Sequence, residues 1–198
     1  MYLPAPMTRP TLSFLPEQRA ELADIYEDTF ASLGNYFTLA DAPNDADTEA
    51  ARSVASTLAG EVHSSDIDSD FYPCTLAGMD PTSDEFFAAL GVARDARCKV
   101  GGFDNPKLEV RRAEPGEGEG SALALITRLN AYELEDVPNY LGPEGKQPID
   151  AAIARLAELG PIVGIQLCTD DGASKVVLTL ARRPSGVHVG VMALRMET

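Results

Sequence analysis

Apolar residues recur at helical spacing through the first part of the chain. After Pro16, apolar side chains three or four positions apart predict an amphipathic helix that stops at Gly34. An acidic loop follows, and a second helix is predicted with Asp45 or Asp47 as its N-cap and Gly60 just past its end. Ahead of both helices, prolines at positions 4, 6, 10 and 16 predict an extended arm over residues 1–15.

The middle of the chain mixes helix and strand patterns. FYPCTL is predicted to be a short edge strand, because Pro73 lacks a backbone N–H. SALALITRLNAYELE fits a helix or a strand, and we favour a helix for its second half. The other middle segments are predicted as a helix (DPTSDEFFAALG), a strand (KLEVRRA), a loop rich in proline and glycine (VPNYLGPEGKQP) and an amphipathic helix (PIDAAIARLAELG).

The last part of the chain changes to strand patterns. Three β-branched runs, PIVGIQLCTDD, SKVVLTLARR and GVHVGVMALRM, are separated by the turn sequences DDGAS and PSG, which predicts an antiparallel meander. Strands gathered at the end of the chain, rather than alternating with helices, indicate an α+β fold. We expect an N-terminal arm and helical extension over residues 1–51 and an α+β domain over residues 52–198.

Net charge is the most informative bulk property. Lys and Arg total 16 against 31 Asp and Glu, a formal charge of −15. Binding to phosphates requires clustered cations, so direct contact with nucleic acid or an anionic membrane is disfavoured. A basic protein partner is favoured instead, although the same charge also serves solubility. No apolar run approaches the ~20 residues that cross a bilayer, and we expect no signal peptide.

Cysteine and histidine are scarce. Cys74, Cys98 and Cys168 are too few and too widely spaced for a disulfide framework or a CxxC metal site, so we expect buried thiols in a reducing, cytoplasmic compartment. Only two histidines, His63 and His188, are present, which excludes a histidine-rich metal centre within one chain. The chain has no GxSxG motif and no glycine-rich phosphate loop.

The segment SSDIDSDFYP places Asp66, Asp68 and Asp70 at alternate positions, as in the first half of a calcium loop. The second half departs from that loop, because Phe71 stands where a glycine must turn the chain and Ala77 where a glutamate must bind the ion. A looser Ca²⁺ or Mg²⁺ site, a pair of catalytic carboxylates in a small hydrolase and a solvated acidic turn all remain open.

Two segments together resemble the nuclease A inhibitor family. The tail KVVLTLARRPSGVHVGVMALRMET matches the strand, turn, strand and terminal Glu-Thr of that family at Pro184, Gly186, Gly190, Glu197 and Thr198. Upstream, SDIDSDF is similar to the family's acidic stretch, with matches at Ser65, Asp66, Asp68 and Phe71. Aspartate stands at position 66 where the family carries glutamate. The resemblance implies an α-β-α sandwich around an antiparallel sheet formed largely by the C-terminal strands.

The resemblance also implies a non-enzymatic function. In family members that are inhibitors, the residues at the positions of Asp66 and Thr198 approach the active site of a sugar-non-specific nuclease, the threonine at its Mg²⁺. The site then comprises Asp66, Asp68, Phe71, Glu197 and Thr198, and the partner is a nuclease with a basic active-site face. The chain itself needs no cofactor for this role. The alternatives are a divalent-metal protein or hydrolase using Asp66, Asp68 and Asp70, and an assembly protein that oligomerises through residues 1–51.

Overall fold

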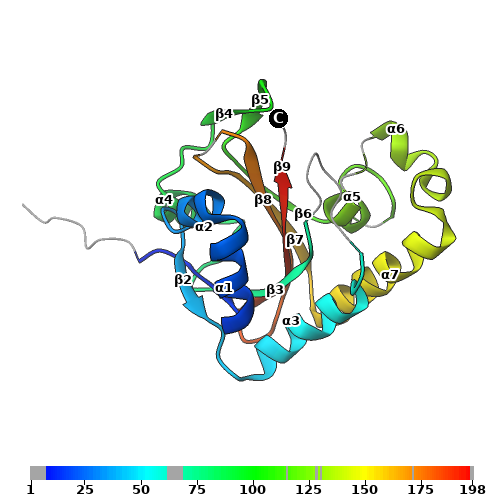
Figure 1. Ribbon diagram of the computed structural model, residues 1–198, viewed down its shortest axis with the longest axis horizontal. Helices are drawn as coiled ribbons and strands as arrows, with labels where there is room; N and C mark the ends of the chain where they lie inside the picture. Colours follow the sequence, from blue (N-terminus) through cyan, green and yellow to red (C-terminus); the bar gives the residue numbers. More distant parts are fainter. Residues whose placement is uncertain are drawn as a thin grey trace, which may run out of the picture.

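A computed structural model shows one β-sheet held between two layers of helices (Figure 1). It describes residues 8–61, 69–114, 116–127, 129, 131–170 and 172–196. The helices are α1 (Pro16–Ile25), α2 (Glu27–Leu33), α3 (Ala46–Thr57), α4 (Asp84–Leu90), α5 (Ala122–Thr127), α6 (Ala131–Leu134) and α7 (Val137–Leu159). The combination of helices with one large sheet confirms the predicted α+β class.

The sheet has seven strands in the order β2-β1-β3-β9-β8-β7-β6. The β1–β2 pair is parallel, and every other neighbouring pair is antiparallel. β4 and β5 form a separate two-stranded hairpin. The strands are β1 (Thr11–Phe14), β2 (Thr38–Asp41), β3 (Tyr72–Ala77), β4 (Arg97–Val100), β5 (Phe103–Pro106), β6 (Leu108–Arg112), β7 (Ile162–Cys168), β8 (Ser174–Arg182) and β9 (His188–Met196). The three predicted C-terminal strands are therefore confirmed as an antiparallel meander.

Helices cover both faces of the sheet, so each face has its own apolar core. α1, α2 and α4 pack on one face through Leu22, Leu33 and Phe86. α3, α5 and α7 pack on the opposite face through Val54, Leu123 and Leu156. Because both faces are covered, β8 and β9 read as nearly continuous apolar runs rather than as an alternation of apolar and polar residues.

Within the N-terminal arm that the prolines predict, Thr11–Phe14 form a strand of this sheet, and residues 1–7 lie outside the described residues. β1 lies between β2 and β3, with Leu12 opposite Leu76. The prediction failed because four residues between two prolines are too short to show a period, and their strand conformation depends on distant partners. The boundary expected after residue 51 falls inside α3, and β1, β2, α1 and α2 all belong to the sandwich.

The prediction of β3 as an edge strand is also wrong, because β3 lies between β1 and β9. Pro73 is tolerated there because the pairing of β3 with β1 begins only at Cys74. On the other side, Pro73 lies opposite Val191 of β9. The first part of β3 therefore has a strand neighbour on only one side, which is compatible with a residue that has no backbone N–H.

The predicted helices at α3 and α4 are confirmed, and three other helical segments differ in extent. Asp45 caps α3, since its side chain accepts hydrogen bonds from the N–H groups of Asp47 and Thr48 at 3.1 and 2.9 Å. The first helix is divided at Tyr26 into α1 and α2. α7 begins within the predicted loop, at Val137, and Gly142 kinks it with a φ of 66°. In the segment SALALITRLNAYELE, only the second half was expected to be helical, and α5 shows that the first half is helical too.

Gly190 marks the closest approach of β9 to β8. A Cβ at this position would lie 2.1 Å from the carbonyl oxygen of Thr179, a backbone atom that cannot rotate away. Gly190→Ala should therefore lower the free energy of unfolding by about 1–3 kcal/mol, as measured by urea denaturation. The matched control is Gly164→Ala on β7, whose Cβ would meet side-chain atoms of Leu125 first rather than backbone atoms. An equal or larger loss in Gly164→Ala would contradict this explanation.

Candidate functional site

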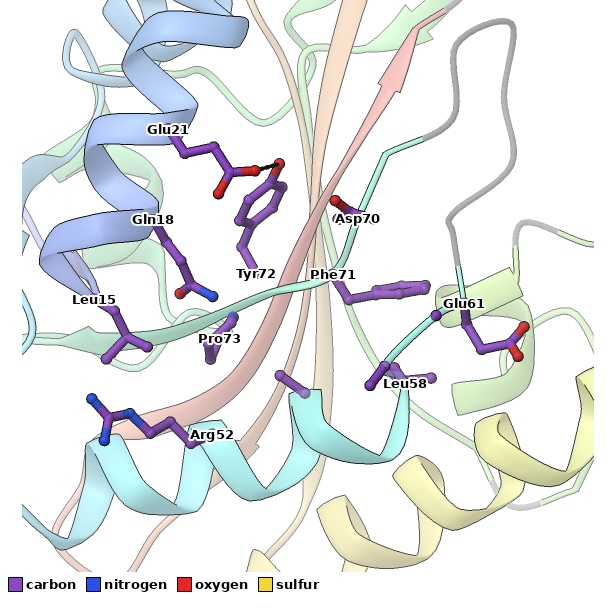
Figure 2. A pocket seen from close by; sticks show the side chains of 13 residues that line it. Leu15, Gln18, Glu21, Arg52, Leu58, Glu61, Asp70, Phe71, Tyr72 and Pro73 are labelled. Atoms are coloured by element: carbon purple, nitrogen blue, oxygen red, sulfur yellow. Dashed lines mark hydrogen bonds between the residues drawn. The ribbon is translucent and has the colours of Figure 1, made fainter.

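A cleft of about 440 Å³ opens where the sheet loses a strand (Figure 2). β1 ends at Phe14 and the chain turns into α1, so the first part of β3 lies uncovered between the two helix layers. α1 forms one wall of the cleft and α3 forms the other. The chain between Glu61 and Ser69, called the acidic loop from here on because it contains Asp66 and Asp68, connects α3 to β3. Glu61 and Asp70, on either side of it, both line the cleft.

The polar walls of the cleft are mainly acidic. Glu21 of α1, Glu61 after α3 and Asp70 before β3 all line it, and Arg52 of α3 is its one lining Lys or Arg among the described residues. The hydroxyl of Tyr72 donates a hydrogen bond to Glu21 Oε1 at 3.4 Å, which holds this carboxylate against the start of β3. Three carboxylates against one guanidinium give the cleft a negative potential that suits a cationic side chain.

Tyr72 and Tyr26 lie beside these carboxylates. Burial raises the pKa of the Tyr72 hydroxyl well above its usual range, and the charges of Tyr26, Glu21 and Asp70 raise it further. Burial and the charge of Asp70 also raise the pKa of Tyr26. Both phenols therefore stay protonated at neutral pH and remain hydrogen-bond donors, so the negative charge of the cleft comes from its carboxylates alone.

Only part of the predicted site falls within the described residues. Asp66, Asp68, Glu197 and Thr198 lie outside them. Phe71 is partly buried and packs against the core under α3, α5 and α7. Asp70 is exposed at the rim of the cleft, and within the described ranges no group of three or more His, Cys, Asp or Glu could hold a metal ion.

The two segments singled out by sequence are neighbours where they enter the described structure. Tyr72 lies opposite Met192 in the β3–β9 pair, and the Leu194 N–H donates to the buried Ser69 Oγ at 3.0 Å. The Ser69 hydroxyl in turn donates to the Asp70 carbonyl at 2.9 Å. The start of the segment that leads into β3 is therefore hydrogen-bonded to the last part of β9.

Sequence reasoning missed Glu21, Glu61 and Tyr72. Glu21 is one of several acids on the exposed face of α1, and no local pattern distinguishes it from its neighbours. These residues come together only because β1 is short, which is a property of the sheet and not of any single segment.

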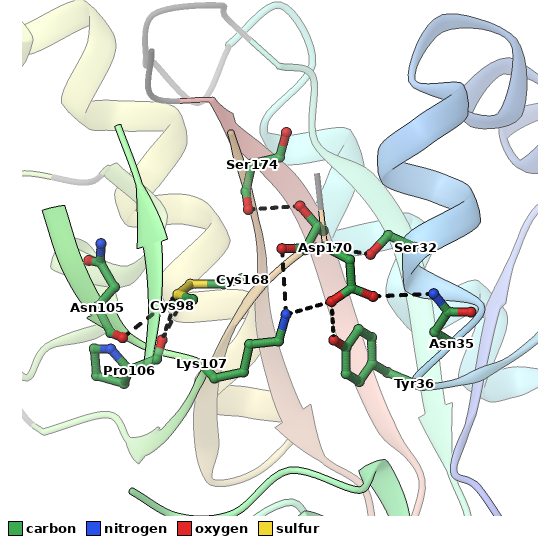
Figure 3. Close-up of polar contacts among 11 residues, drawn as sticks. Ser32, Asn35, Tyr36, Cys98, Asn105, Pro106, Lys107, Cys168, Asp170 and Ser174 are labelled. Atoms are coloured by element: carbon green, nitrogen blue, oxygen red, sulfur yellow. Dashed lines mark hydrogen bonds and ion pairs between the residues drawn. A yellow bond between two sulfur atoms is a disulfide. The ribbon is translucent and has the colours of Figure 1, made fainter. Parts of the chain in front are cut away.

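A second polar cluster, centred on Asp170, joins three distant segments (Figure 3). Its carboxylate accepts hydrogen bonds from Lys107 Nζ at 2.7 Å, from the Tyr36 hydroxyl at 2.5 Å and from Asn35 Nδ2 at 3.2 Å. The Asp170 N–H donates to Ser32 Oγ at 2.8 Å. The cluster ties the turn after β7 to the end of α2 and to the start of β6, and all its polar groups have partners, so its role is structural.

Protonation of this cluster is strongly biased toward the charged carboxylate. Burial acts to raise the pKa of Asp170, but hydrogen bonds from Lys107, Tyr36 and Asn35 and the Lys107 charge outweigh it, and the pKa falls to about 2. Lys107 shows the mirror effect: burial acts to lower its pKa, and the bonds to Asp170 and Tyr36 raise it overall. The Lys107–Asp170 pair therefore stays charged across the neutral range.

The expectation of three buried thiols is wrong for two of the cysteines. Cys98 on β4 and Cys168 at the end of β7 form a disulfide across 70 residues of chain (Figure 3). The fold places the separate β4–β5 hairpin beside the end of β7, which cysteine spacing could not reveal. Cys74 is a buried free thiol, and burial raises its pKa well above the usual range. Cysteine usage therefore no longer supports a reducing compartment.

The comparisons with known proteins return no relative: no family model matches the chain, and neither does any curated protein. Within the described parts of the chain, no helix combines the length and the apolar character that crossing a membrane requires.

The hydrogen bond at Ser69 can be tested directly. Ser69→Ala leaves the buried Leu194 N–H without an acceptor and should lower the free energy of unfolding by about 1–3 kcal/mol in urea denaturation. Ser56→Ala is the matched control, because the Ser56 hydroxyl bonds its own helix at an exposed site and its loss should change stability little. Equal effects of the two substitutions would mean that Ser69 does not anchor the loop to β9.

The Asp170 cluster predicts a stability difference that depends on pH. The folded pKa of about 2 lies below the value of roughly 3.9 for an unfolded aspartate, so the stabilisation is present above pH ~4 and is lost as the pH falls toward 2. Asp170→Asn should lower stability at pH 7 by about 1–2 kcal/mol, a discounted figure because 47% of the side chain is exposed.

The measurement is urea denaturation of both proteins at several pH values, with the exposed Asp84→Asn as a control. The gap between the wild type and Asp170→Asn should narrow steadily below pH ~4. A gap that stays constant down to pH ~2 would contradict the assigned role of the carboxylate.

Proposed function

We propose that the protein is a non-enzymatic binding module whose acidic cleft receives a basic segment of a partner protein. The observation that carries this proposal is the convergence of Glu21, Glu61 and Asp70 on one cleft at the base of the acidic loop. Arg52 lies on the other wall of the cleft and adds a positive charge there. A bound segment that avoids this charge is restricted in its orientation.

Electrostatics supports a protein partner more than a small ligand. The formal charge of −15 attracts a basic surface over long range and speeds the encounter, while the cleft supplies local complementarity. The apolar side chains of Leu15, Leu58 and Pro73 also line the cleft. They can pack against the aliphatic stem of a lysine or arginine whose charged end meets the carboxylates.

Chain geometry supports a role for the C-terminal tail at the same site. In the sequence, Asp66 comes three residues before Ser69 and Thr198 comes two residues after Met196. Met196 is two residues beyond Leu194, which is bonded to Ser69. Both segments can therefore serve one binding surface.

A sugar-non-specific nuclease is the most concrete partner that we propose, because the sequence resemblance points to that class. Such an enzyme holds polyanionic phosphate beside Mg²⁺, so Asp66 and Thr198 would imitate substrate and fill open positions on the metal of the partner. Asp68, Phe71 and Glu197 complete the surface in this proposal, Phe71 by supporting the loop from the core.

The first test uses nuclease activity. We expect the protein to inhibit a Mg²⁺-dependent, sugar-non-specific nuclease, and both Asp66→Asn and deletion of Glu197-Thr198 to weaken inhibition at least about tenfold, a loss of one buried charged contact. Glu85→Gln on α4 is the matched control and should inhibit like the wild type. Full inhibition by the tail deletion would contradict the role of the C-terminus.

The second test addresses the cleft itself. Replacing Glu21, Glu61 and Asp70 by their amides should weaken binding of a lysine-rich peptide and make the remaining affinity less sensitive to salt, as measured by calorimetry. Replacing Glu85, Asp95 and Glu144 removes the same charge from other surfaces and is the control. Equal losses in both triple variants would show that net charge, and not the cleft, determines binding.

Calorimetric titration with Ca²⁺ and Mg²⁺ separates this proposal from a metal site at the acidic loop. The binding module predicts no heat that depends on Asp66, Asp68 or Asp70. Tight binding of either ion that Asp66→Asn abolishes would favour the metal-binding alternative instead.

A further inference from the structure

A second pocket lies at the opposite end of β9 from the acidic loop. It has a volume of about 200 Å³ and is formed where β6, β7, β8 and β9 meet the loop between β3 and α4. Its polar lining differs from that of the acidic cleft, because it contains Arg112, Arg182 and His188 with Asp80 as its only carboxylate among the described residues. A locally cationic pocket is unexpected in a chain with a formal charge of −15.

His188 is the key group in this pocket. Its side chain is only 3% exposed, and its Nδ1 atom is buried without a hydrogen-bond partner among the described residues. Buried polar atoms are nearly always paired, so an unpaired one on a residue that lines a pocket is open to a partner supplied by a ligand. Burial lowers the pKa of the imidazole, and the charge of Arg182 acts in the same direction against Asp80. The ring is therefore neutral at pH 7 and can donate one N–H.

The two arginines approach from the same face of the sheet as His188. Arg182 lies opposite His188 in the β8–β9 pair, and Arg112 lies opposite Val163 in the β6–β7 pair. Residues alternate between faces along a strand, and Met192 and Leu194 place His188 on the face covered by α4. The same alternation places Arg182 with Leu180, and Arg112 with Val110, on that face.

Asp80 does not cancel this charge. Its carboxylate accepts hydrogen bonds from the Thr82 N–H at 2.9 Å and the Thr82 hydroxyl at 2.8 Å, and it pairs with Arg182 at 3.3 Å. These bonds, the backbone one first, lower the pKa of Asp80 and fix the guanidinium of Arg182 in place. Among the described residues, Arg112 is bonded to the Thr82 hydroxyl alone, at 3.5 Å, which leaves most of its donors for a ligand.

We propose that this pocket binds a small organic anion, a carboxylate or phosphate group on a short apolar body. The guanidinium groups of Arg112 and Arg182 would hold the anionic group and His188 Nδ1–H would donate to it, while Pro161, Ile162 and Val163 contact the apolar part. A water occupies about 30 Å³, so the pocket admits only a few non-hydrogen atoms. Its volume is below the ~300 Å³ at which sites for drug-sized ligands begin.

The test is calorimetric titration of the whole protein with inorganic phosphate and, separately, with butyrate. At least one anion should bind at millimolar concentration or tighter, and the arm that binds identifies the anionic group. Arg112→Gln and Arg182→Gln should each weaken that binding at least about tenfold. Arg19→Gln removes the same charge from an exposed pair on α1 and should leave binding unchanged.

Histidine variants separate ligand binding from folding. His188→Leu should abolish binding without lowering the melting temperature, because it removes an unpaired buried polar atom. His188→Asn retains a donor near the position of Nδ1 and should keep measurable binding. The proposal is overturned if neither anion binds at millimolar concentration, if the arginine variants bind like the wild type, or if His188→Leu binds unchanged.

Discussion

The antiparallel pairing of β3 with β9 is the constraint on which the rest of the structure depends. Its register fixes the acidic loop at one end of β9 and His188 at the other, since Tyr72 lies opposite Met192 and Leu76 opposite His188. On its two sides the pair joins the N-terminal strands to the C-terminal meander, so one sheet unites segments from both ends of the chain. A slip of one residue would exchange the apolar sets of the two faces and break both cores at once.

The arrangement of charge follows from this sheet. The large acidic excess is tolerated because most carboxylates are exposed, and the one that ties three segments together, Asp170, is matched by Lys107 and by two neutral donors. Arg112, Arg182 and His188 lie together at one end of the sheet, while Glu21, Glu61 and Asp70 lie where β1 has ended. The net charge of the chain therefore does not predict the local charge of either pocket. That local charge depends on which strand ends lie next to each other in the sheet.

Local signals made about half of this structure predictable from the sequence. The N-cap of α3 could be narrowed to Asp45 or Asp47 because capping depends on neighbouring residues alone. β8 and β9 could be predicted because long runs of β-branched residues favour strands. β1 and the Cys98–Cys168 pair were not predictable, because both depend on partners far along the chain. The same limit applies to the sites: Asp70 and Phe71 could be singled out from one segment, whereas Glu21, Tyr72 and His188 acquire meaning only through the sheet.

The acidic cleft exists because β1 is short. A first strand two residues longer would cover Tyr72 and Pro73, close the gap between α1 and α3, and require a backbone N–H where Pro73 has none. Pro73 correctly indicated an edge, but only for the first residues of β3. Over the rest of its length β3 lies in the interior of the sheet. That uncovered edge lies between two helix layers, so helices bound the acidic cleft while Glu21, Glu61 and Asp70 supply its charge. A rigid cleft needs little reordering when a partner binds, and more of the contact energy is then available as affinity.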